Sequence, residues 1–167
     1  MPRLILLNGP PGCGKSTLAQ RFVDEHPLTA SLDVDRVRSM IGGWQDNLIE
    51  AGLLARAMTL AMARTLLTSD HDVVVPQYLG RVDFIHELEQ LAERAGASFI
   101  EIVLLDSLEN SVTRYLTRGG GESPAALGEM YDRLVQLLAT RPDVQIIHNH
   151  EGRVDEAYGA LLECLPS

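Results

Sequence analysis

The sequence predicts an α/β domain built on a parallel β-sheet. Short apolar runs of strand length alternate along the chain with longer segments of helical period, as in sheets whose strands are joined by crossover helices. The apolar runs are rich in valine, isoleucine and leucine, which indicates strands buried on both faces. A length of 167 residues suits one ordinary domain, so we expect residues 1–167 to form a single domain.

The predicted elements follow one another from the first residues to the last. Five strands are predicted, at residues 4–8, 30–33, 72–75, 99–105 and 144–148. Seven helices are predicted, at residues 15–25, 36–41, 48–67, 83–95, 108–117, 124–138 and 153–162. Pro27 ends the first helix and Gly42 ends the second, because proline and glycine interrupt helices.

Capping residues mark several of these boundaries. Asp83 is a predicted N-cap, and Gly96 is a predicted C-terminal stop of the same helix. Ser107 is predicted to cap the next helix, and Ser123 followed by Pro124 suits an N-cap and first helical position. The three glycines at 119–121 predict a mobile loop between these last two helices.

Composition restricts the partners and the compartment. Acidic residues number 23 against 14 basic ones, a formal charge of -9, so the field of the chain repels nucleic-acid backbones and anionic lipid. We expect no long nucleic acid and no membrane among the partners, and a monomer or homodimer. Cys13 and Cys164 provide no disulfide framework, and the first apolar run is too short for a signal peptide. These features predict a cytoplasmic protein.

A phosphate-binding loop follows the first predicted strand. Residues 9–17 contain a complete G-x-x-x-x-G-K-S motif between a strand and a helix, where backbone N–H groups and the helix dipole favour a polyanion. Lys15 is expected to reach the β- and γ-phosphates, and the Ser16 hydroxyl to bind Mg²⁺. We therefore predict that ATP and Mg²⁺ bind here. The predicted nucleotide contacts in the loop are Gly9, Pro10, Pro11, Gly12, Cys13, Gly14, Lys15, Ser16 and Thr17.

Lys15 is the only lysine of the chain, and this narrows the class of P-loop protein. A GTPase reads its base with an Asn-Lys-x-Asp motif, which needs a second lysine, so that class is close to excluded. A motor ATPase needs a strand ending in Asp-Glu, whereas Asp106 is followed by Ser107. A phosphotransferase needs a base near the acceptor hydroxyl, cations around the transferred phosphoryl group and a closing lid. Residues suited to all three are present.

The motifs Asp33-Val-Asp35-Arg36-Val-Arg38 and Arg114-Tyr-Leu-Thr-Arg118, together with the phosphate-binding loop, carry a family resemblance. The chain resembles P-loop kinases of the nucleoside-monophosphate-kinase-like group, and especially bacterial chains described as AAA family ATPases or predicted kinases. The group includes shikimate and gluconate kinases, chloramphenicol phosphotransferase, zeta-toxin-like kinases and polynucleotide 5′-kinases. The resemblance implies a five-stranded parallel sheet of order 2-3-1-4-5 with helices on both faces, an acceptor-binding segment at about 36–67 and a short lid at about 114–128.

The resemblance also implies roles for the residues after the second strand. Asp35 and Arg38 are similar to a D-x-x-R motif in which the aspartate is the general base and the arginine holds the acceptor. Asp33 is similar to the first carboxylate of a D-x-D motif that orients a water on Mg²⁺, with Asp106 as the alternative metal support. A purely structural interpretation remains open, in which Asp35 caps the next helix and Asp33 faces solvent.

Arginines of the expected lid are the candidate cations. Arg114 and Arg118 are four residues apart and therefore share a helix face. The resemblance implies that Arg114 stacks on the adenine and that Arg118 touches the phosphates; the alternative is that both lie on a solvated helix surface. Arg133 is a weaker candidate for the lid cation. Arg153, after the last strand, either contacts the nucleotide base or ribose or only packs.

Three further residues are candidate acceptor contacts. Gln77 follows the third strand, where many relatives have an acid, and its amide can both donate and accept hydrogen bonds. Arg81 lies four residues further and either meets the acceptor or lies on the surface. Trp44, the only tryptophan, follows Gly42-Gly43 and either closes a pocket on the acceptor or packs the short second helix on the core.

Together these features predict an enzyme that transfers the γ-phosphate of ATP to a hydroxyl of a small-molecule acceptor, such as an antibiotic, sugar or nucleoside. One alternative is a nucleoside, nucleotide or 5′-hydroxyl polynucleotide kinase. The other is an ATP-binding switch or interaction module with vestigial hydrolysis.

Overall fold

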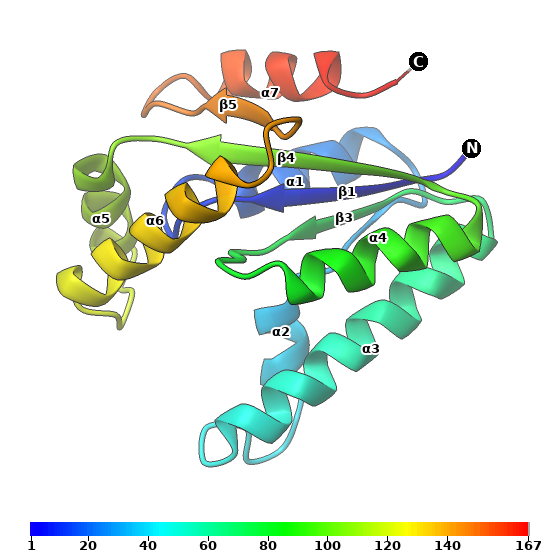
Figure 1. The fold of residues 1–167 in the computed structure, drawn as a ribbon, viewed down its shortest axis with the longest axis horizontal. Helices are drawn as coiled ribbons and strands as arrows, with labels where there is room; N and C mark the ends of the chain where they lie inside the picture. The colour runs from blue at the N-terminus through cyan, green and yellow to red at the C-terminus, as the bar shows by residue number, and fades with distance from the viewer. Residues whose placement is uncertain (167) are drawn as a thin grey trace.

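The strands form one five-stranded parallel sheet in the order β2-β3-β1-β4-β5, which confirms the predicted fold class (Figure 1). The structure is a computed structural model that describes residues 1–166. The strands are β1 (Arg3–Asn8), β2 (Ala30–Ser31), β3 (Val73–Pro76), β4 (Ser98–Leu105) and β5 (Gln145–His148). In the central strand β1, Leu4 lies opposite Val73 of β3 and Phe99 of β4.

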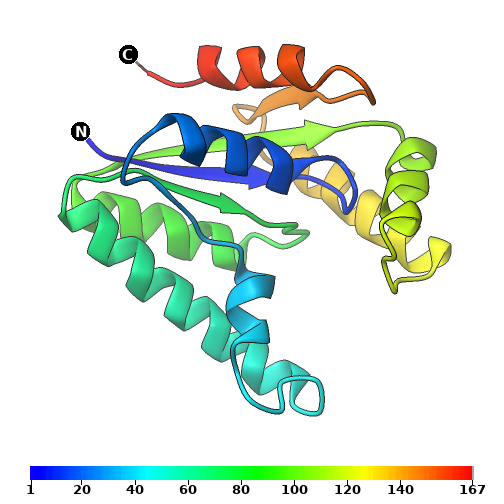
Figure 2. The ribbon, with the colours of Figure 1, turned by 180° about the vertical axis from the view of Figure 1, so that it is seen from behind.

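Helices cover both faces of the sheet. They are α1 (Lys15–Glu25), α2 (Val34–Ser39), α3 (Leu48–Thr68), α4 (Asp83–Ala95), α5 (Leu108–Thr117), α6 (Pro124–Ala139) and α7 (Val154–Glu163). Helices α1 and α7 lie on one face, and α3 and α4 lie on the other, as Figures 1 and 2 show from opposite sides. None of the helices within residues 1–166 is both long enough and apolar enough to cross a membrane.

The hydrophobic core explains why β1 has no polar alternation. Leu4 and Leu6 pack with residues of α3 and α4, whereas Ile5 and Leu7 pack with residues of α1 and α7. Successive side chains of a strand point to opposite faces, so all four are fully or almost fully buried. This burial on both sides anchors the carboxyl end of β1, where the phosphate-binding loop begins.

The structure corrects the predicted boundaries of the second strand and the second helix, and the predicted N-cap of the fourth helix. The second strand ends at Ser31 rather than at residue 33, because the Asp33 side chain caps α2 and accepts hydrogen bonds from the N–H groups of Asp35 and Arg36. Helix α2 therefore begins at Val34, two residues earlier than expected. It ends at Ser39 with Met40 as its C-cap, so the prediction that Gly42 ends it was wrong. Asp83 is not an N-cap: Val82 holds that position, and Asp83 lies in the first turn of α4.

The remaining predicted caps are confirmed. The hydroxyl of Ser107 accepts from the N–H of Asn110, and that of Ser123 accepts from the N–H of Ala126. Gly96 ends α4 in the left-handed conformation with φ 68°. The two serine caps fix the starts of α5 and α6, which lie beyond the carboxyl ends of β1 and β4 (Figures 1 and 2).

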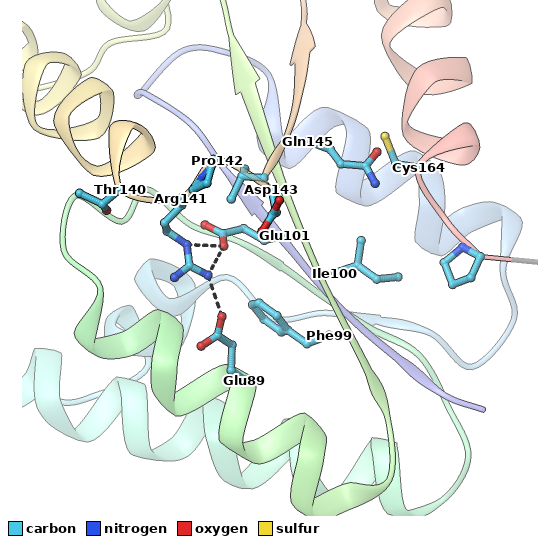
Figure 3. Close-up of a pocket in the computed structure, with 12 residues that line it drawn as sticks. Glu89, Phe99, Ile100, Glu101, Thr140, Arg141, Pro142, Asp143, Gln145 and Cys164 are labelled. Carbon is cyan, nitrogen blue, oxygen red and sulfur yellow. Dashed lines mark hydrogen bonds and ion pairs between the residues drawn. The ribbon is translucent and has the colours of Figure 1, made fainter.

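At the amino ends of β4 and β5, an ion cluster joins three elements around a pocket of about 550 Å³ (Figure 3). Arg141 forms ion pairs of 2.5 Å with Glu101 of β4 and 2.6 Å with Glu89 of α4. Burial raises the pKa of Glu101; Arg141 opposes that rise, and the nearby Glu89 adds to it. The cluster ties α4 and β4 to the turn between α6 and β5, far along the strands from the phosphate-binding loop.

Replacing Arg141 with methionine is expected to lower the free energy of unfolding by about 2–4 kcal/mol at neutral pH, because Glu101 loses its cation while its side chain stays 5% exposed. The folded-state pKa of Glu101 lies above its ordinary 4.5, so protonation of this group favours the folded state. The loss is therefore expected to shrink as the pH is lowered toward 4.5 and to grow as it rises. Urea unfolding across this pH range measures both effects.

The Arg141→Met/Glu101→Gln double variant is the control. Removing both charges of a buried pair together is often nearly neutral, so the double variant is expected to recover at least half of the lost stability. A loss below about 1 kcal/mol in the single variant would show that the cluster contributes as little as an exposed ion pair.

Candidate active site

The phosphate-binding loop joins β1 to α1 and takes its shape from glycines in the left-handed conformation. Gly12 has φ 81° and Gly14 has φ 96°, values that side chains with a Cβ rarely adopt. A Cβ on Gly14 would collide with the Asn149 side-chain amide, and one on Gly12 would collide with the carbonyl of Ser111. The loop is therefore a close-fitting backbone turn whose N–H groups remain at the amino end of α1.

The Gly14→Ala variant is expected to lose about 2–3 kcal/mol of stability, from the left-handed backbone and from displacement of Asn149. It is also expected to bind an ATP analogue more weakly, because the turn that presents the N–H groups is distorted. Thermal unfolding and fluorescence titration measure the two effects. The matched control is Gly52→Ala in α3, where nothing lies within 4 Å of the added Cβ. That control is expected to gain up to about 1 kcal/mol from helix propensity.

Two buried asparagines, Asn8 and Asn149, hold the loop in place, and sequence analysis did not predict this role for either of them. The Asn8 side chain donates to the carbonyl of Leu79 at 2.9 Å and accepts from the N–H groups of Gly9 and Leu79, both at 2.8 Å. The Asn149 amide donates to the carbonyl of Cys13 at 2.7 Å. Both asparagines stand at the end of an apolar strand, and this was the signal in the sequence that could have identified them. A buried polar side chain at such a position needs hydrogen-bond partners.

Lys15 lies over the loop that precedes it. Its ammonium group donates to the carbonyls of Gly9 at 2.8 Å and Pro10 at 2.9 Å. Ser16 and Thr17, the next two residues of α1, are exposed. The cation and the Ser16 hydroxyl therefore stand at the helix N-terminus that a polyphosphate would approach.

A pocket of about 420 Å³ brings the loop together with residues from four other segments: the start of α2, the end of β3, the α5 region and α6. Besides Lys15, seven of the predicted site residues line it: Pro11, Gly12, Ser16, Asp33, Asp35, Arg38 and Gln77. The carboxyl ends of parallel strands meet at one edge of the sheet, which is why segments after β1, β2 and β3 converge here.

The D-x-x-R residues form a connected group in this pocket. Arg38 lies 3.2 Å from the Asp35 carboxylate, and its guanidinium lies 5.0 Å from the ring centre of Trp44. The Asp35 side chain is 62% exposed, so its oxygens are accessible from the pocket. Asp33 accepts through one carboxylate oxygen as the cap of α2 and also lines the pocket. Trp44 therefore supports Arg38 and does not itself line this pocket.

The remaining wall contains residues that sequence analysis did not select. Tyr115 of α5 and Glu122 of the following loop line the pocket, and the Tyr115 ring lies against Gly120, where a Cβ would collide with it. Burial raises the pKa of Tyr78, and the nearby charge of Arg133 opposes that rise. The Tyr78 hydroxyl therefore stays protonated, and it donates to the carbonyl of Met130 at 2.8 Å. The side-chain oxygen of Gln77 is buried without a hydrogen-bond partner in the described part of the chain.

The other predicted site residues lie outside this pocket. Arg118 is the exposed C-cap of α5, and Arg153 is exposed and pairs with Glu156 at 3.6 Å. Arg81 lines a neighbouring pocket. Arg114 pairs with Asp106 at 2.6 Å and also donates to the carbonyl of Asn149 at 3.3 Å.

Asp106 is fully engaged in holding the start of α5. Besides Arg114, it interacts with the Ser107 N–H, the Asn110 side chain and His150 Nδ1, at 2.7, 3.2 and 3.1 Å. Burial works to raise the pKa of Asp106, but these hydrogen bonds and the Arg114 charge outweigh it and hold the pKa below its ordinary value. Of the two alternatives for metal support, Asp33 is thus the one that shares a pocket with Ser16.

Several solved structures share this fold. A candidate kinase from Chloroflexus aurantiacus is 23% identical, with a TM-score of 0.72, over 97% of this chain and 94% of that one. The tunicamycin resistance protein of Deinococcus radiodurans is 18% identical, with a TM-score of 0.64, over 97% and 96%. A chain of the Pnkp1/Rnl/Hen1 RNA repair complex is 20% identical, with a TM-score of 0.69, over 86% of this chain and 47% of that one. No curated protein matches the chain.

The family comparison agrees with the fold. Residues 4–136, most of the chain, match the model of the AAA domain family. This match spans the phosphate-binding loop, the D-x-x-R residues and the glycine loop between α5 and α6. The chain therefore belongs to the AAA domain family, and its domain is a P-loop kinase-like domain.

Proposed function

We propose that the chain is an ATP-dependent phosphotransferase that phosphorylates a hydroxyl group of a small molecule. The observation that supports this proposal is the 420 Å³ pocket, which joins the phosphate-binding loop to the Asp35–Arg38 pair and Gln77. A nucleotide-binding switch needs the loop alone, whereas a phosphotransferase also needs a base and acceptor contacts beside it.

The residues present fit a nucleoside triphosphate and Mg²⁺. The left-handed glycines Gly12 and Gly14 shape a turn that brings backbone N–H groups to the amino end of α1, and exposed Ser16 provides a hydroxyl ligand in the pocket that the Asp33 carboxylate also lines. When bound, ATP supplies the phosphoryl group, and Mg²⁺ neutralises part of the phosphate charge. Lys15 adds a fixed positive charge at the same end of α1.

The chain's own residues then divide the remaining tasks. Asp35 accepts the proton of the acceptor hydroxyl, because it is the exposed carboxylate beside Arg38. Arg38 holds the acceptor, and Trp44 restricts the guanidinium by stacking. Tyr115 and Glu122 close the pocket from the lid side and reduce the access of water. Arg118, on the same lid, provides a cation at the phosphoryl group if the lid closes further.

The test is ADP release by the purified protein with ATP and Mg²⁺ against a panel of hydroxyl acceptors. The panel holds sugars, nucleosides, a 5′-hydroxyl oligonucleotide and hydroxylated antibiotics, because one structural neighbour is a tunicamycin resistance protein. We expect one class to raise ADP release by orders of magnitude and to gain a phosphate by mass spectrometry. ATP binding that no acceptor converts into faster ADP release would instead favour the switch function.

A further inference from the structure

The pocket of about 550 Å³ at the amino ends of β4 and β5 lies apart from the candidate active site (Figure 3). Its wall comes from α4, β4, the turn between α6 and β5, and the residues that follow α7. It shares no lining residue with the pocket at the phosphate-binding loop, which lies at the carboxyl ends of the same parallel strands. A molecule bound here therefore occupies neither the nucleotide site nor the acceptor site.

Arg141 leaves one oxygen of the Glu101 carboxylate without a partner. Its Nε and Nη2 atoms both contact Oε2 of Glu101, at 2.7 and 2.5 Å, and Nη2 also contacts Oε1 of Glu89 at 2.6 Å. The other oxygen, Oε1 of Glu101, is buried and has no hydrogen-bond partner in the part of the chain that the structure describes. The Glu101 side chain is only 5% exposed, so an unpaired acceptor at this position is costly.

The side chains around the pocket carry an excess of negative charge. Asp143 lines the pocket together with Glu89 and Glu101, and Arg141 is the one cation among its described lining residues. Asp143 makes no ion pair within residues 1–166. A ligand that carries positive charge and donates hydrogen bonds would satisfy Oε1 and balance the excess of carboxylates.

The lining of the pocket favours an organic cation over a metal ion. Within residues 1–166, no three histidine, cysteine, aspartate or glutamate side chains are grouped so that they could hold a metal ion. Phe99, which is half-buried and on the same face of β4 as Glu101, also lines the pocket, and aromatic rings attract organic cations. A volume of about 550 Å³ is that of a small-molecule site.

We propose that this pocket binds a small organic cation, an amine or a guanidine, through the Oε1 atom of Glu101. The ammonium or guanidinium group donates a charge-assisted hydrogen bond to this oxygen, and the Asp143 carboxylate and the Phe99 ring add attraction. The site is separate from the proposed phosphotransferase function, so its test needs neither an acceptor nor turnover.

The experiment is an NMR titration of the full chain with butylamine, and separately with butylguanidine, at constant ionic strength. The candidate active site is first saturated with Mg²⁺ and a non-hydrolysable ATP analogue, because Asp33 and Asp35 there also attract cations. We expect saturable shifts of backbone amides within 99–101 and 141–145, and a Kd at least about 10-fold higher in Glu101→Gln. The cation with the lower Kd indicates whether the ligand is an amine or a guanidine, and 1-butanol is expected not to bind.

The matched control is Glu93→Gln, which removes one exposed carboxylate of α4 outside the pocket. Both substitutions change the net charge equally, so only Glu101→Gln is expected to weaken binding. Equal Kd values in the wild type and Glu101→Gln, or no saturable shifts in the pocket of the wild type, would overturn the inference. Tighter binding of Ca²⁺ than of either organic cation, lost in Glu101→Gln, would also overturn it in favour of a metal site.

Circular dichroism and urea unfolding show whether Glu101→Gln folds, since Arg141 then keeps only Glu89 as its partner. If it does not fold, Asp143→Asn takes its place, because this substitution is on the exposed rim and leaves the ion cluster intact. Asp143→Asn is expected to raise the Kd about 2- to 5-fold. The shift map of the wild type decides the location of the site without any variant.

Discussion

The Lys15→Met variant is expected to lose nearly all phosphotransfer, with kcat/KM lower by about 10²–10³. Lys15 is the only lysine in the chain, and its ammonium lies over the loop, bonded to the carbonyls of Gly9 and Pro10. Methionine keeps the length of the side chain but removes the charge that balances the transferred phosphoryl group. Titration with a fluorescent ATP analogue and the rate of ADP release measure the loss in binding and in turnover.

The Lys15→Arg variant is the control for charge alone. A planar guanidinium cannot replace a compact ammonium that fits between two loop carbonyls, so this variant is expected to recover little activity. Both variants are expected to unfold within about 1 kcal/mol of the wild type, since the two hydrogen bonds that the lysine donates are only partly buried. Analogue affinity and ADP release within twofold of the wild type for Lys15→Met would contradict the role of the loop.

The fold was predictable because local signals and burial agree along the chain. Apolar strands without alternation indicated a sheet covered on both faces, and Leu4 to Leu7 are buried in that way. The wrong boundary of the second strand arose where two local signals compete. Asp33 satisfies the first N–H groups of α2, and this competes with extension of a two-residue edge strand. Propensity alone does not indicate which of the two prevails.

The site was predictable where its residues are adjacent in the sequence. The phosphate-binding loop and the Asp35–Arg38 pair are short-range motifs, and both reach the same pocket. The contacts of Asn8 with Leu79, 71 residues away, and of Asn149 with Cys13, 136 residues away, depend on how distant loops meet. Arg118 lies outside the pocket because α5 ends with that side chain exposed, which helical spacing does not show.

The Asp35→Asn variant is expected to lower kcat by about 10²–10⁴ while leaving the KM for ATP unchanged, because asparagine keeps the shape but cannot accept the acceptor proton. Stability is expected to change little, since the Asp35 carboxylate is 62% exposed and its ion pair with Arg38 is screened by solvent. Steady-state ADP release at saturating acceptor, with urea unfolding in parallel, measures both quantities.

Asp33→Asn is the matched control, because asparagine caps a helix as well as aspartate does and therefore keeps α2 in place. If Asp33 supports the metal, this variant needs a higher Mg²⁺ concentration for half-maximal activity but retains most of its kcat. The pocket is lined by three carboxylates, and the third belongs to Glu122 of the lid loop. Retention of more than half of the wild-type kcat by Asp35→Asn, with a large loss in Glu122→Gln, would move the base from the D-x-x-R motif to the lid.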